Sequence, residues 1–391
     1  MYRVILKHQK NNNHMKILFT GGGSGGHFYP IIAIAEEINR LVKDEKLLPA
    51  NLYFMSDSPY DAHALAENNI KFVSNPSGKV RRYFSILNFF DLFKTAYGMV
   101  VSLFKVFGIF PDVVFSKGAY ASFPVVMAAR ILGIPVMIHE SDSVPGRANV
   151  WAGKFAKRIA VSYPEAANYF KRKDVVAHTG NPLRREIRLI GENKNANEYL
   201  SLDQFVPTIL VLGGSLGSEI INDSILEVLP QLVQKFQIIH QTGKNNITEV
   251  KQTANVVLQN NPLANRYRAF DYLNNLSLSM AASVSKLVIT RAGSTIFEIA
   301  NWGVPSIVIP ITNSAGDHQR HNAYSYARSG AATVIEESNL SGAVLMQEIH
   351  RIFDQPEALN KMSESAKSFS NPDAAEKIAR EVLRIGLSHE K

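Results

Sequence analysis

Short apolar runs alternate with amphipathic segments along almost the whole chain. The runs are rich in β-branched residues, which predicts strands. In the first half they are Lys16–Thr20, Leu52–Met55, Asp112–Phe115, Val136–His139 and Arg158–Val161. In the second half they are Thr208–Leu212, Gln237–His240, Leu287–Thr290, Ser306–Pro310 and Thr333–Ile335. Because strands that alternate with helices form right-handed β–α–β units, the pattern predicts an α/β protein with parallel sheets.

A polar stretch separates the two groups of strands. Its centre, Gly191-Glu192-Asn193-Lys194-Asn195, is typical of a linker. At 391 residues the chain is also long for a single hydrophobic core. We therefore expect an N-terminal domain over 15–182, a linker over 183–206 and a C-terminal domain over 207–368. Residues 369–391 are expected to form a C-terminal helix, and its packing back on the N-terminal domain is one arrangement open to it.

One amphipathic segment, Ser85–Phe107, carries an unusual number of aromatic residues. Its apolar positions are three or four residues apart, as on one face of a helix: Ile86, Phe89, Phe93, Tyr97, Val100, Phe104 and Phe107. Charged residues interrupt the segment, which excludes a membrane-spanning helix. Two interpretations stay open. The helix packs on the sheet in the ordinary way, or its aromatic face rests on an anionic bilayer beside the basic residues that precede it. The second interpretation places five residues at the membrane: Arg81, Arg82, Phe89, Phe93 and Phe104.

The amino-acid composition excludes some kinds of functional site and favours certain partners. The chain has no cysteine, which excludes disulfides, thiolate metal sites and cysteine nucleophiles. Its net charge of +8 favours anionic partners such as nucleotides or acidic lipid surfaces, and no basic low-complexity tract indicates nucleic acid. Residues 1–14 are polar and basic, with an apolar stretch too short for a signal peptide. Met15, just before the first strand, is an alternative native start.

A glycine-rich segment, Gly21 to His27, joins the first predicted strand to a predicted helix. Such a turn exposes backbone N–H groups at the helix N-terminus, which suits a phosphate or diphosphate. The alternative is a tight turn without a ligand. The segment ends Gly-Gly-His and so is not a Walker A loop. Asp57 follows it by about thirty residues rather than roughly twenty, which does not favour a nicotinamide cofactor.

Polar residues also follow later strands of the first half. His139-Glu140-Ser141-Asp142 closes one strand, and a carboxylate there could orient or deprotonate a sugar hydroxyl. Alternatively, Glu140 and Asp142 only cap the next helix. At the domain junction, Arg184 could clamp a diphosphate or could be solvated beside a turn.

The second half contains two further glycine turns, at Gly213–Gly217 and at Arg291–Thr295. Glu298 lies on the helix after the second turn, where it could accept both hydroxyls of a ribose or be an ordinary solvated glutamate. Asp317-His318-Gln319 opens a later helix; its amide and imidazole could hold sugar hydroxyls, while Asp317 could serve as an N-cap. The sequence lacks Asp-x-Asp and His-Glu-x-x-His, so it offers no metal–diphosphate handle or zinc motif of those types.

Together these motifs resemble the MurG family of N-acetylglucosamine transferases, which complete the lipid-linked peptidoglycan precursor. The resemblance runs from about Met15 to the C-terminal helices and keeps six motifs in order. They are Gly-Gly-Ser-Gly-Gly-His at 22–27, His-Glu at 139–140, Gly-Asn-Pro-Leu-Arg at 180–184, Gly-Gly-Ser at 213–215, Arg-Ala-Gly at 291–293 and Asp-His-Gln at 317–319. The resemblance implies a GT-B fold, in which two doubly wound, Rossmann-like parallel-sheet domains face each other across a cleft.

The resemblance also implies the reaction. N-acetylglucosamine passes from UDP-N-acetylglucosamine to the 4-hydroxyl of undecaprenyl-diphospho-N-acetylmuramoyl-peptide, with inversion and without a metal or other cofactor. The enzyme is expected at the cytoplasmic face of the cell membrane as a peripheral protein, and nucleic acid is not among its expected partners. Two alternatives remain: a diacylglycerol glycosyltransferase of the same fold, and a non-catalytic sugar-nucleotide-binding protein.

Roles for individual residues follow from the same resemblance. On the donor side, Arg184 and Ser215 should contact the diphosphate, Glu298 the ribose, Phe270 the uracil, and His318 and Gln319 the sugar, with Ser294 and Thr295 in the turn before Glu298. On the acceptor side, Ser24, Gly25 and Gly26 should meet the lipid diphosphate, with Asp142 and Asn149 nearby. His27 is the first choice for the general base and Glu140 the second. Two departures stand out: the family usually has Glu-Gln-Asn where this chain has Glu140-Ser141-Asp142, and the turn between Arg291 and Glu298 is one residue short.

Overall fold

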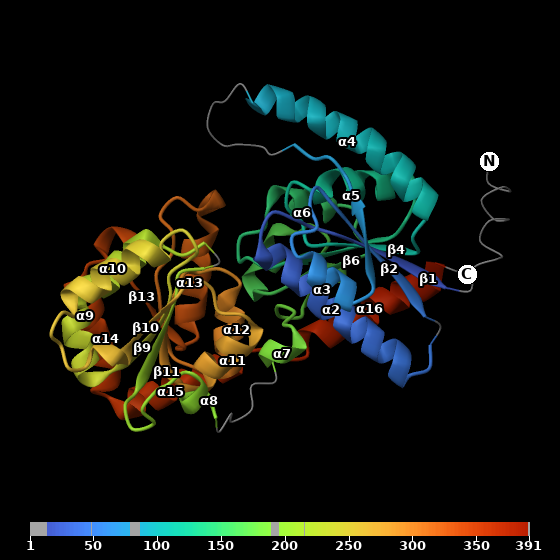
Figure 1. Ribbon diagram of the computed structural model, residues 1–391. Coiled ribbons are helices and arrows are strands. Elements are labelled where there is room, and N and C mark those ends of the chain that lie inside the picture. Colours follow the sequence, from blue (N-terminus) through green and yellow to red (C-terminus); the bar gives the residue numbers. More distant parts are fainter. Residues whose placement is uncertain (1–13, 48, 79–86, 189–194, 215, 390–391) are drawn as a thin grey trace, which may run out of the picture. The chain divides into compact units, whose positions relative to one another are not determined.

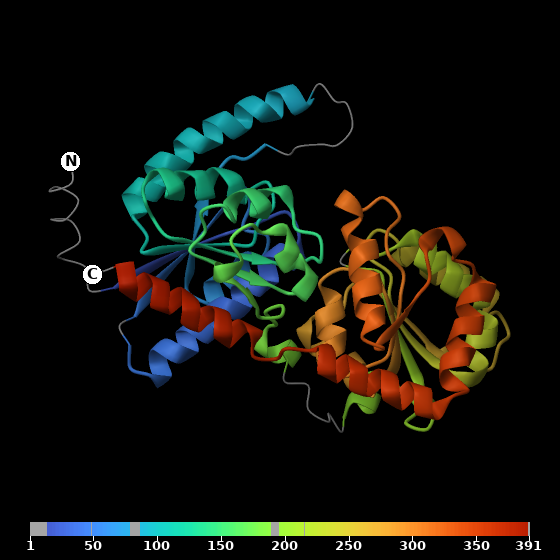
Figure 2. The same ribbon diagram turned by 180° about the vertical axis from the view of Figure 1, so that it is seen from behind.

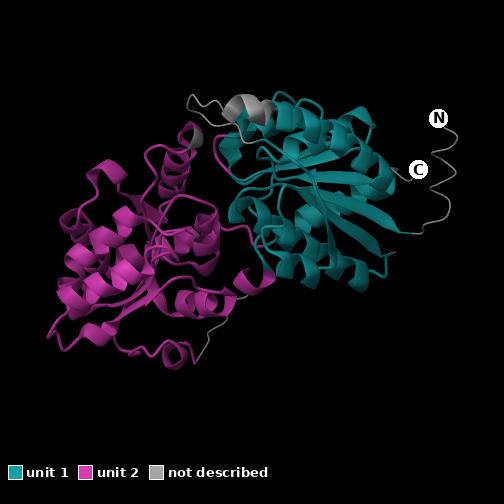
Figure 3. Ribbon diagram, turned by 45° about the horizontal axis from the view of Figure 1, so that its top comes forward, with its two compact units in different colours: residues 1–141, 145–184, 373–391 teal, residues 142–144, 185–372 magenta. Residues whose placement is uncertain are grey.

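The chain folds into two compact units, each built around its own parallel sheet (Figures 1 and 3). The computed structural model describes residues 14–47, 49–78, 87–188, 195–214 and 216–389. Unit 1 consists of residues 1–141, 145–184 and 373–391, and unit 2 consists of residues 142–144 and 185–372.

Unit 1 contains a seven-stranded parallel sheet in the order β3-β2-β1-β4-β5-β6-β7. Its strands are β1 (Met15–Thr20), β2 (Ala50–Ser56), β3 (Ile70–Ser74), β4 (Val113–Ser116), β5 (Val136–Glu140), β6 (Arg158–Val161) and β7 (Val176–His178). The chain builds the sheet outward from β1 to β3 and then returns to build β4 to β7 on the other side. The connection therefore reverses between β1 and β4, the point at which doubly wound sheets usually bind their ligands.

Helices cover both faces of this sheet (Figures 1 and 2). They are α2 (Gly25–Asp44), α3 (Ala62–Glu67), α4 (Leu87–Ile109), α5 (Ser122–Ile131), α6 (Arg147–Ala152) and α16 (Ala374–His389), with short 3₁₀ turns η1 (Pro164–Tyr169) and η2 (Lys173–Val175). Helices α2 and α16 lie side by side on one face and bury Ile17, Phe19 and Phe54 of the sheet. Apolar residues of α16, among them Ile378 and Val382, belong to the same core. The last helix of the chain is thus an integral part of unit 1.

Ion pairs tie α16 to the rest of unit 1. Arg40 of α2 lies 3.0 Å from Glu376, and Glu45 lies 2.6 Å from Arg380. On the other side of the helix, Arg158 of β6 lies 2.9 Å from Glu381. These pairs are partly exposed and individually contribute little, so the apolar contacts carry most of the packing energy.

Helix α4 packs on α5 and presents aromatic residues outward. Phe93 is 59% exposed and Phe104 is 72% exposed, and Tyr97, Val100 and Phe107 are exposed on the same helical face. On the inner side Gly98 is buried against the backbone of Pro76, and Lys105 donates a hydrogen bond to the carbonyl of Ser74. Within the described residues, no helix is both long and apolar enough to cross a membrane. Arg81 and Arg82 and the side chain of Phe89 fall outside what the structure describes.

Unit 2 contains a six-stranded parallel sheet in the order β10-β9-β8-β11-β12-β13. Its strands are β8 (Thr208–Leu212), β9 (Gln237–Gln241), β10 (Tyr267–Phe270), β11 (Ser285–Thr290), β12 (Ser306–Val308) and β13 (Ala332–Val334). Its helices are α7 (Arg185–Arg188), α8 (Ala196–Tyr199), α9 (Glu219–Lys235), α10 (Ile247–Val257), α11 (Asn275–Val284), α12 (Thr295–Trp302), α13 (His318–Arg328), α14 (Gly342–Phe353) and α15 (Pro356–Phe369), with 3₁₀ turns η3 (Ala264–Arg266), η4 (Ala315–Asp317) and η5 (Glu337–Asn339).

The inner strands of unit 2 are buried on both faces. In β8, Ile209 and Val211 pack with α9 and α14, whereas Leu210 and Leu212 pack with α11 and α12. Because successive side chains of a strand point to opposite faces, a strand covered by helices on both sides reads as a continuous apolar run. This explains why the sequence of Thr208–Leu212 predicts a strand so readily.

Candidate functional site

The glycine-rich segment of unit 1 forms the turn between β1 and α2. Gly23 has φ +87°, a conformation that favours glycine, and a Cβ atom on Gly22 would lie 2.8 Å from Oγ of Ser56. The first turn of α2 contains no acidic residue, so nothing there offsets the positive end of this 20-residue helix. Ser24 is the N-cap, and Gly25 and Gly26 begin the helix. These three predicted acceptor residues therefore lie at a helix N-terminus that suits a diphosphate.

His27 is fixed by a hydrogen bond to the main chain after β4. Its Nδ1 lies 3.2 Å from the carbonyl oxygen of Lys117. Since a carbonyl oxygen can only accept, Nδ1 carries the proton and the neutral ring keeps its lone pair on Nε2. His27 is half-buried.

Beneath the glycine turn lies a buried polar cluster around Lys117 and His139. Nζ of Lys117 is 2.6 Å from Nδ1 of His139 and also donates to Oγ of Ser141. Nε2 of His139 is 3.1 Å from the carbonyl oxygen of Gly180 and 3.3 Å from Oγ of Ser162. Burial, reinforced by the positive charge of Lys117, holds the pKa of His139 well below its ordinary value of 6.5. His139 is therefore a neutral imidazole at physiological pH.

Glu140 holds the turn that leads into α6. Its Oε2 accepts hydrogen bonds from the backbone N–H of Gly146, at 3.0 Å, and from Nδ2 of Asn149, at 2.9 Å. Gly146 is the N-cap of α6, and the Asn149 amide also donates to the carbonyl of His139. Glu140 and Asn149 are each 3% exposed. Glu140 therefore holds the backbone that leads into α6, and its contact with a substrate stays a prediction.

Asp142 takes part in a different contact from Glu140. It belongs to unit 2, where its Oδ1 accepts a hydrogen bond from Nδ2 of Asn322 at 2.9 Å. Oδ1 of Asn322 in turn accepts from the backbone N–H and the hydroxyl of Ser143. The carboxylate that stands at the family's asparagine position thus pairs with a side chain of α13.

Arg184 closes unit 1 at the sequence junction between the two units. Its guanidinium carbon lies 3.9 Å from the centre of the Tyr29 ring, a cation–π contact with the first turns of α2. Tyr29 itself packs edge-on against Phe28 and Tyr60. Arg184 is therefore held beside the helix that the glycine turn begins.

The predicted donor residues of unit 2 lie at the carboxyl edge of its sheet. The turn Gly213–Gly217 follows β8, Phe270 ends β10, and Ser294, Thr295 and Glu298 follow β11. His318 and Gln319 open α13 after β12. Because parallel strands end at one edge, the fold brings these residues to the same side of the sheet. Ser215 falls outside the described residues.

Close packing explains the glycines of the turn after β8. Gly217 has φ +80°, and a Cβ atom on it would lie 1.8 Å from the carbonyl oxygen of Thr242. The turn is braced by Arg291, which donates to Oγ of Ser218 at 2.7 Å and to Glu337 at 2.6 Å. Ser218 is the N-cap of α9. Arg291 therefore orders the N-terminus of α9 from the neighbouring strand.

Contacts within the protein orient several of the predicted donor residues. Oε1 of Gln319 accepts from the backbone N–H of Ile311 at 3.1 Å. The carbonyl of Phe270 accepts from the N–H of Thr242 at 2.9 Å. Asp317 is the N-cap residue of α13, with φ +60°, and its side chain makes no capping hydrogen bond. Glu298 is half-buried on the first turn of α12.

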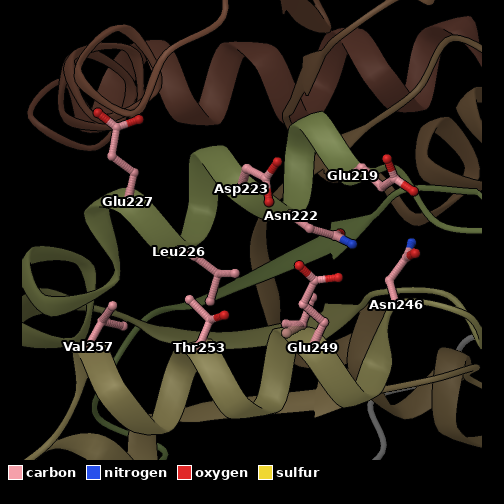
Figure 4. A pocket seen from close by; sticks show the side chains of 10 residues that line it. Glu219, Asn222, Asp223, Leu226, Glu227, Asn246, Glu249, Thr253 and Val257 are labelled. Carbon is pink, nitrogen blue, oxygen red and sulfur yellow. The ribbon is translucent and has the colours of Figure 1, made fainter.

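Two grooves are lined by residues other than the predicted site residues. One, of about 410 Å³, runs between α9 and α10 and is lined by Glu219, Asp223, Glu227 and Glu249 together with Asn222 and Asn246 (Figure 4). The other, of about 430 Å³, is lined by Lys286, Trp302 and Lys367 among others. Four carboxylates would repel a diphosphate, so the first groove does not suit a nucleotide. Among the described residues no group of three or more His, Cys, Asp or Glu could hold a metal ion.

Lys117 is the functional candidate that the sequence did not indicate. Lysine is rarely buried, so a lysine after a predicted strand is expected to be solvated. The sequence shows only that a strand ends near Ser116-Lys117-Gly118. Its position could have indicated a role. Lys117 directly follows β4, and β4 pairs in the sheet with β1, the strand that leads into the glycine turn.

Comparisons with known proteins agree with the fold. Residues 17–161 match the glycosyltransferase family 28 N-terminal domain, and residues 208–378 match the glycosyltransferase family 28 C-terminal domain. The chain is 35% identical over 370 residues to a UDP-N-acetylglucosamine–N-acetylmuramyl-(pentapeptide) pyrophosphoryl-undecaprenol N-acetylglucosamine transferase 3 of Bacillus thuringiensis, with 94% of this chain and 99% of the relative covered. It is 36% identical to the corresponding transferase of Halothermothrix orenii, with 92% and 95% covered.

Solved structures share the fold at lower identity. MurG of Acinetobacter baumannii matches with a TM-score of 0.71 at 22% identity, covering 95% of this chain and 99% of that one. UDP-GlcNAc 2-epimerase of Neisseria meningitidis, bound to UDP-GlcNAc, matches with a TM-score of 0.66 at 15% identity, covering 95% and 100%. Two doubly wound parallel-sheet domains of the GT-B type are therefore confirmed, while the epimerase shows that this fold also serves other reactions.

Proposed function

Because the chain belongs to the family of UDP-N-acetylglucosamine–N-acetylmuramyl-(pentapeptide) pyrophosphoryl-undecaprenol N-acetylglucosamine transferases, we propose that it transfers N-acetylglucosamine from UDP-N-acetylglucosamine to that lipid-linked acceptor. The similarity over nearly the whole length of both chains carries the proposal. The chain is accordingly a hexosyltransferase of glycosyltransferase family 28.

The reaction is a single in-line displacement. The 4-hydroxyl of the muramoyl sugar attacks the anomeric carbon of N-acetylglucosamine, the bond from that carbon to the UDP oxygen breaks, and the configuration inverts. The hydroxyl proton passes to a general base, and UDP leaves with an added negative charge. A positioned base typically contributes about 10²–10⁴-fold to the rate.

His27 is the proposed base. Its Nδ1 donates to the Lys117 carbonyl, so the lone pair on Nε2 is the one that can take a proton. Glu140 is less suited, because it is buried and one of its oxygens already accepts two hydrogen bonds that hold the α6 turn. We assign Glu140 to positioning Asn149 and the acceptor loop.

The acceptor diphosphate is proposed to bind Ser24, Gly25 and Gly26 at the N-terminus of α2. A 20-residue helix whose first turn lacks acidic residues favours an anion at that end. Asn149 and Asp142 complete the proposed acceptor contacts, and Asp142 would have to exchange its hydrogen bond with Asn322 to do so.

The donor is proposed to bind the carboxyl edge of the unit 2 sheet. Glu298 accepts the ribose hydroxyls, Phe270 lies over the uracil, and His318 and Gln319 hold the sugar. The diphosphate lies at the N-terminus of α9 with Ser215, Ser294, Thr295 and Arg184. Helix and guanidinium charges stabilise the leaving UDP, and the sequence has no Asp-x-Asp handle for a divalent cation.

Helix α4 is the proposed membrane contact. Its outward face carries exposed aromatic residues, Phe93 and Phe104 among them, and basic residues at Arg81 and Arg82 precede it in the sequence. An aromatic face flanked by cations suits the headgroup region of an anionic bilayer. We propose that the enzyme works as a peripheral protein at the cytoplasmic face of the membrane, where a lipid-linked acceptor is within reach.

A direct assay tests the function. Purified protein is incubated with radiolabelled UDP-N-acetylglucosamine and a short-chain analogue of the lipid-linked muramoyl acceptor, in the presence of EDTA. We expect a labelled disaccharide product. Diacylglycerol is offered in parallel, and labelling of diacylglycerol alone would replace this proposal with the glycolipid alternative. Binding of UDP-N-acetylglucosamine without turnover on either acceptor would indicate a non-catalytic protein.

A further inference from the structure

Lys117 contacts two histidines, His27 and His139, at the carboxyl edge of the unit 1 sheet. We infer that Lys117 is a positioning residue for proton transfer: it fixes the carbonyl group that holds His27 in the proton-accepting tautomer. The inference rests on the proposed function, in which His27 takes the hydroxyl proton of the acceptor.

Lys117 reaches the two imidazoles through different atoms. Its backbone carbonyl accepts from Nδ1 of His27 at 3.2 Å, and its ammonium donates to Nδ1 of His139 at 2.6 Å. An ammonium can only donate, so Nδ1 of His139 is the accepting nitrogen. The carbonyl of Gly180, 3.1 Å from Nε2 of His139, can only accept, which requires the proton on Nε2. The two rings are thus held in opposite tautomers, and Lys117 contacts Nδ1 of both.

The ammonium is anchored across several strands. Lys117 is 1% exposed, and besides His139 it donates to Oγ of Ser141. His139 lies in β5 and reaches Ser162 after β6 and Gly180 after β7. Polar contacts therefore run from the Lys117 side chain across the carboxyl ends of the neighbouring strands.

The backbone at Lys117 is restrained on both sides as well. Its N–H donates to the carbonyl of Thr20 at 2.9 Å, which ties it to the end of β1. The next residue, Gly118, has φ +80°, and a Cβ atom on it would lie 2.8 Å from the amide of Asn149. For the carbonyl group of Lys117 to rotate away from His27, either the hydrogen bonds of the ammonium group or these backbone contacts must break.

Packing alone would not favour a lysine at this position. Moving an ammonium out of water is costly, and an unbranched apolar side chain of similar length would fill the same space without that cost. The lysine is therefore explained by what its charge and its hydrogen bonds do, which is to order the turn that holds His27.

The test compares Lys117→Met with the wild-type protein, both full-length and labelled with ¹⁵N-histidine. Long-range ¹H–¹⁵N correlation spectra report which nitrogen of His27 carries its proton, with the His27 signals assigned by their loss in His27→Gln. Steady-state kinetics with UDP-N-acetylglucosamine and the short-chain acceptor give kcat and the donor KM. Lys154→Met, which changes an exposed lysine of the same unit, is the matched control.

We expect Lys117→Met to lose the pure Nδ1–H signature of His27 and to lower kcat about 10- to 100-fold, with the donor KM changed less than about twofold. Lys154→Met should match the wild type in both readouts. A folded Lys117→Met protein in which His27 keeps its Nδ1–H tautomer overturns the inference, whatever its kcat. So does a changed tautomer with unchanged kcat.

The test still gives an answer if the variant is unstable or if the wild-type protein is inactive. If Lys117→Met melts below the assay temperature, Ser141→Ala removes one anchor of the ammonium and is expected to shift both readouts in the same direction by a smaller amount; no shift overturns the inference. A wild-type protein that does not turn over the lipid acceptor contradicts the proposed function, and the tautomer spectra then decide the inference by themselves.

Discussion

The imidazole of His240 accepts a hydrogen bond from the hydroxyl of Tyr267 at its Nδ1, across 2.9 Å, and its Nε2 lies 3.0 Å from Oδ1 of Asn222. This arrangement suits a neutral ring, because the amide oxygen takes a proton donor at Nε2 and the hydroxyl can then donate to the lone pair on Nδ1. Full burial lowers the pKa of His240 from 6.5 to about 3. Unit 2 therefore contains an imidazole that must become charged when the protein unfolds in mild acid.

Acid should destabilise unit 2 through His240. With a folded-state pKa of about 3 and an unfolded-state value of 6.5, the unfolded state binds more protons between these limits, so stability is full above pH 6.5 and falls as the pH drops toward 3. The loss over the whole window is on the order of a few kcal/mol. Thermal melts at a series of pH values measure it. In His240→Gln the slope between pH 6.5 and 4 should flatten; an identical slope would assign the acid sensitivity to other groups.

Unit 1 should respond to acid in the same direction. The pKa of His139 is held well below 6.5 by burial and by Lys117, so this ring also binds its proton more readily in the unfolded chain. His240→Gln is therefore expected to flatten only part of the pH dependence of the whole protein.

Glu298→Ala should raise the donor KM. If the carboxylate accepts the ribose hydroxyls, its loss removes hydrogen bonds to a charged group, worth about 1.5–3 kcal/mol, or roughly tenfold to more than a hundredfold in affinity. Isothermal titration with UDP and steady-state kinetics give the two readouts. Glu364→Ala, at an exposed position in the same unit, should leave both unchanged. An unaltered donor KM in Glu298→Ala would remove this residue from the site.

Two glycines of α4 should respond in opposite ways to the same substitution. A Cβ atom on Gly98 would lie 2.0 Å from the carbonyl oxygen of Pro76, whereas a Cβ atom on Gly108 meets nothing within 4 Å. Alanine in a helix is favoured over glycine by about 1 kcal/mol, so Gly108→Ala should stabilise by up to that amount. Gly98→Ala should destabilise, because the helix must move away from the backbone it packs on. Thermal melts of the two variants measure both changes. Equal shifts of the melting temperature would show that α4 does not pack at Gly98 in solution.

The exposed aromatic residues of α4 should matter for lipid binding and not for folding. Phe104→Ser changes a side chain that is 72% exposed, so the melting temperature should stay near that of the wild type. Sedimentation with anionic vesicles should fall clearly, and turnover on a water-soluble acceptor analogue should persist.

Replacing the basic residues Lys79, Arg81 and Arg82 with glutamine should weaken the same vesicle binding by about 1 kcal/mol each, and less at high salt. Full vesicle binding in both the serine and the glutamine variants would contradict the proposed membrane face. A Phe104→Ser protein that unfolds would instead make the helix part of the core.

Removing residues 373–391 should unfold unit 1. The deletion takes Ile378, Val382 and Ile385 out of the core that β1 and α2 form. Each fully buried aliphatic side chain contributes about 1.5–3 kcal/mol, so their sum approaches the whole stability of a typical domain. Limited proteolysis should then leave a resistant fragment from unit 2 only. Arg384→Ala, at an exposed position of α16, is the control and should melt like the wild type.

The sequence predicted the inner strands well, and the physical reason is their burial. Every predicted run overlaps an observed strand, while β3, β7 and β10 were missed. All three lie at sheet edges, where most of their residues are partly or fully exposed, and none of them is a continuous apolar run. The glycine turns were equally readable, because backbone conformation and close contacts demand glycine at positions such as Gly23 and Gly217.

Side-chain partners across the fold could not be predicted in the same way. Asn322 pairs with Asp142, 180 positions earlier in the chain. Whether Glu140 capped a helix or faced a substrate was open in the sequence, because both roles need a carboxylate at the end of a strand. Lys117 was missed because a buried lysine has the same local sequence pattern as an exposed one. Only its burial and its contact with His139 show the difference.

Because α16 completes the core of unit 1, the order of synthesis and the order of folding differ. A ribosome releases β1 to β7 long before it adds residues 374–389, so the nascent first unit must keep an apolar face uncovered while the whole of unit 2 is made. Residues 185–372 need only the short segment 142–144 from earlier in the chain, so the second unit can finish first. During that interval the uncovered face is a natural binding surface for chaperones, and translational pauses after residue 372 would lengthen the exposure.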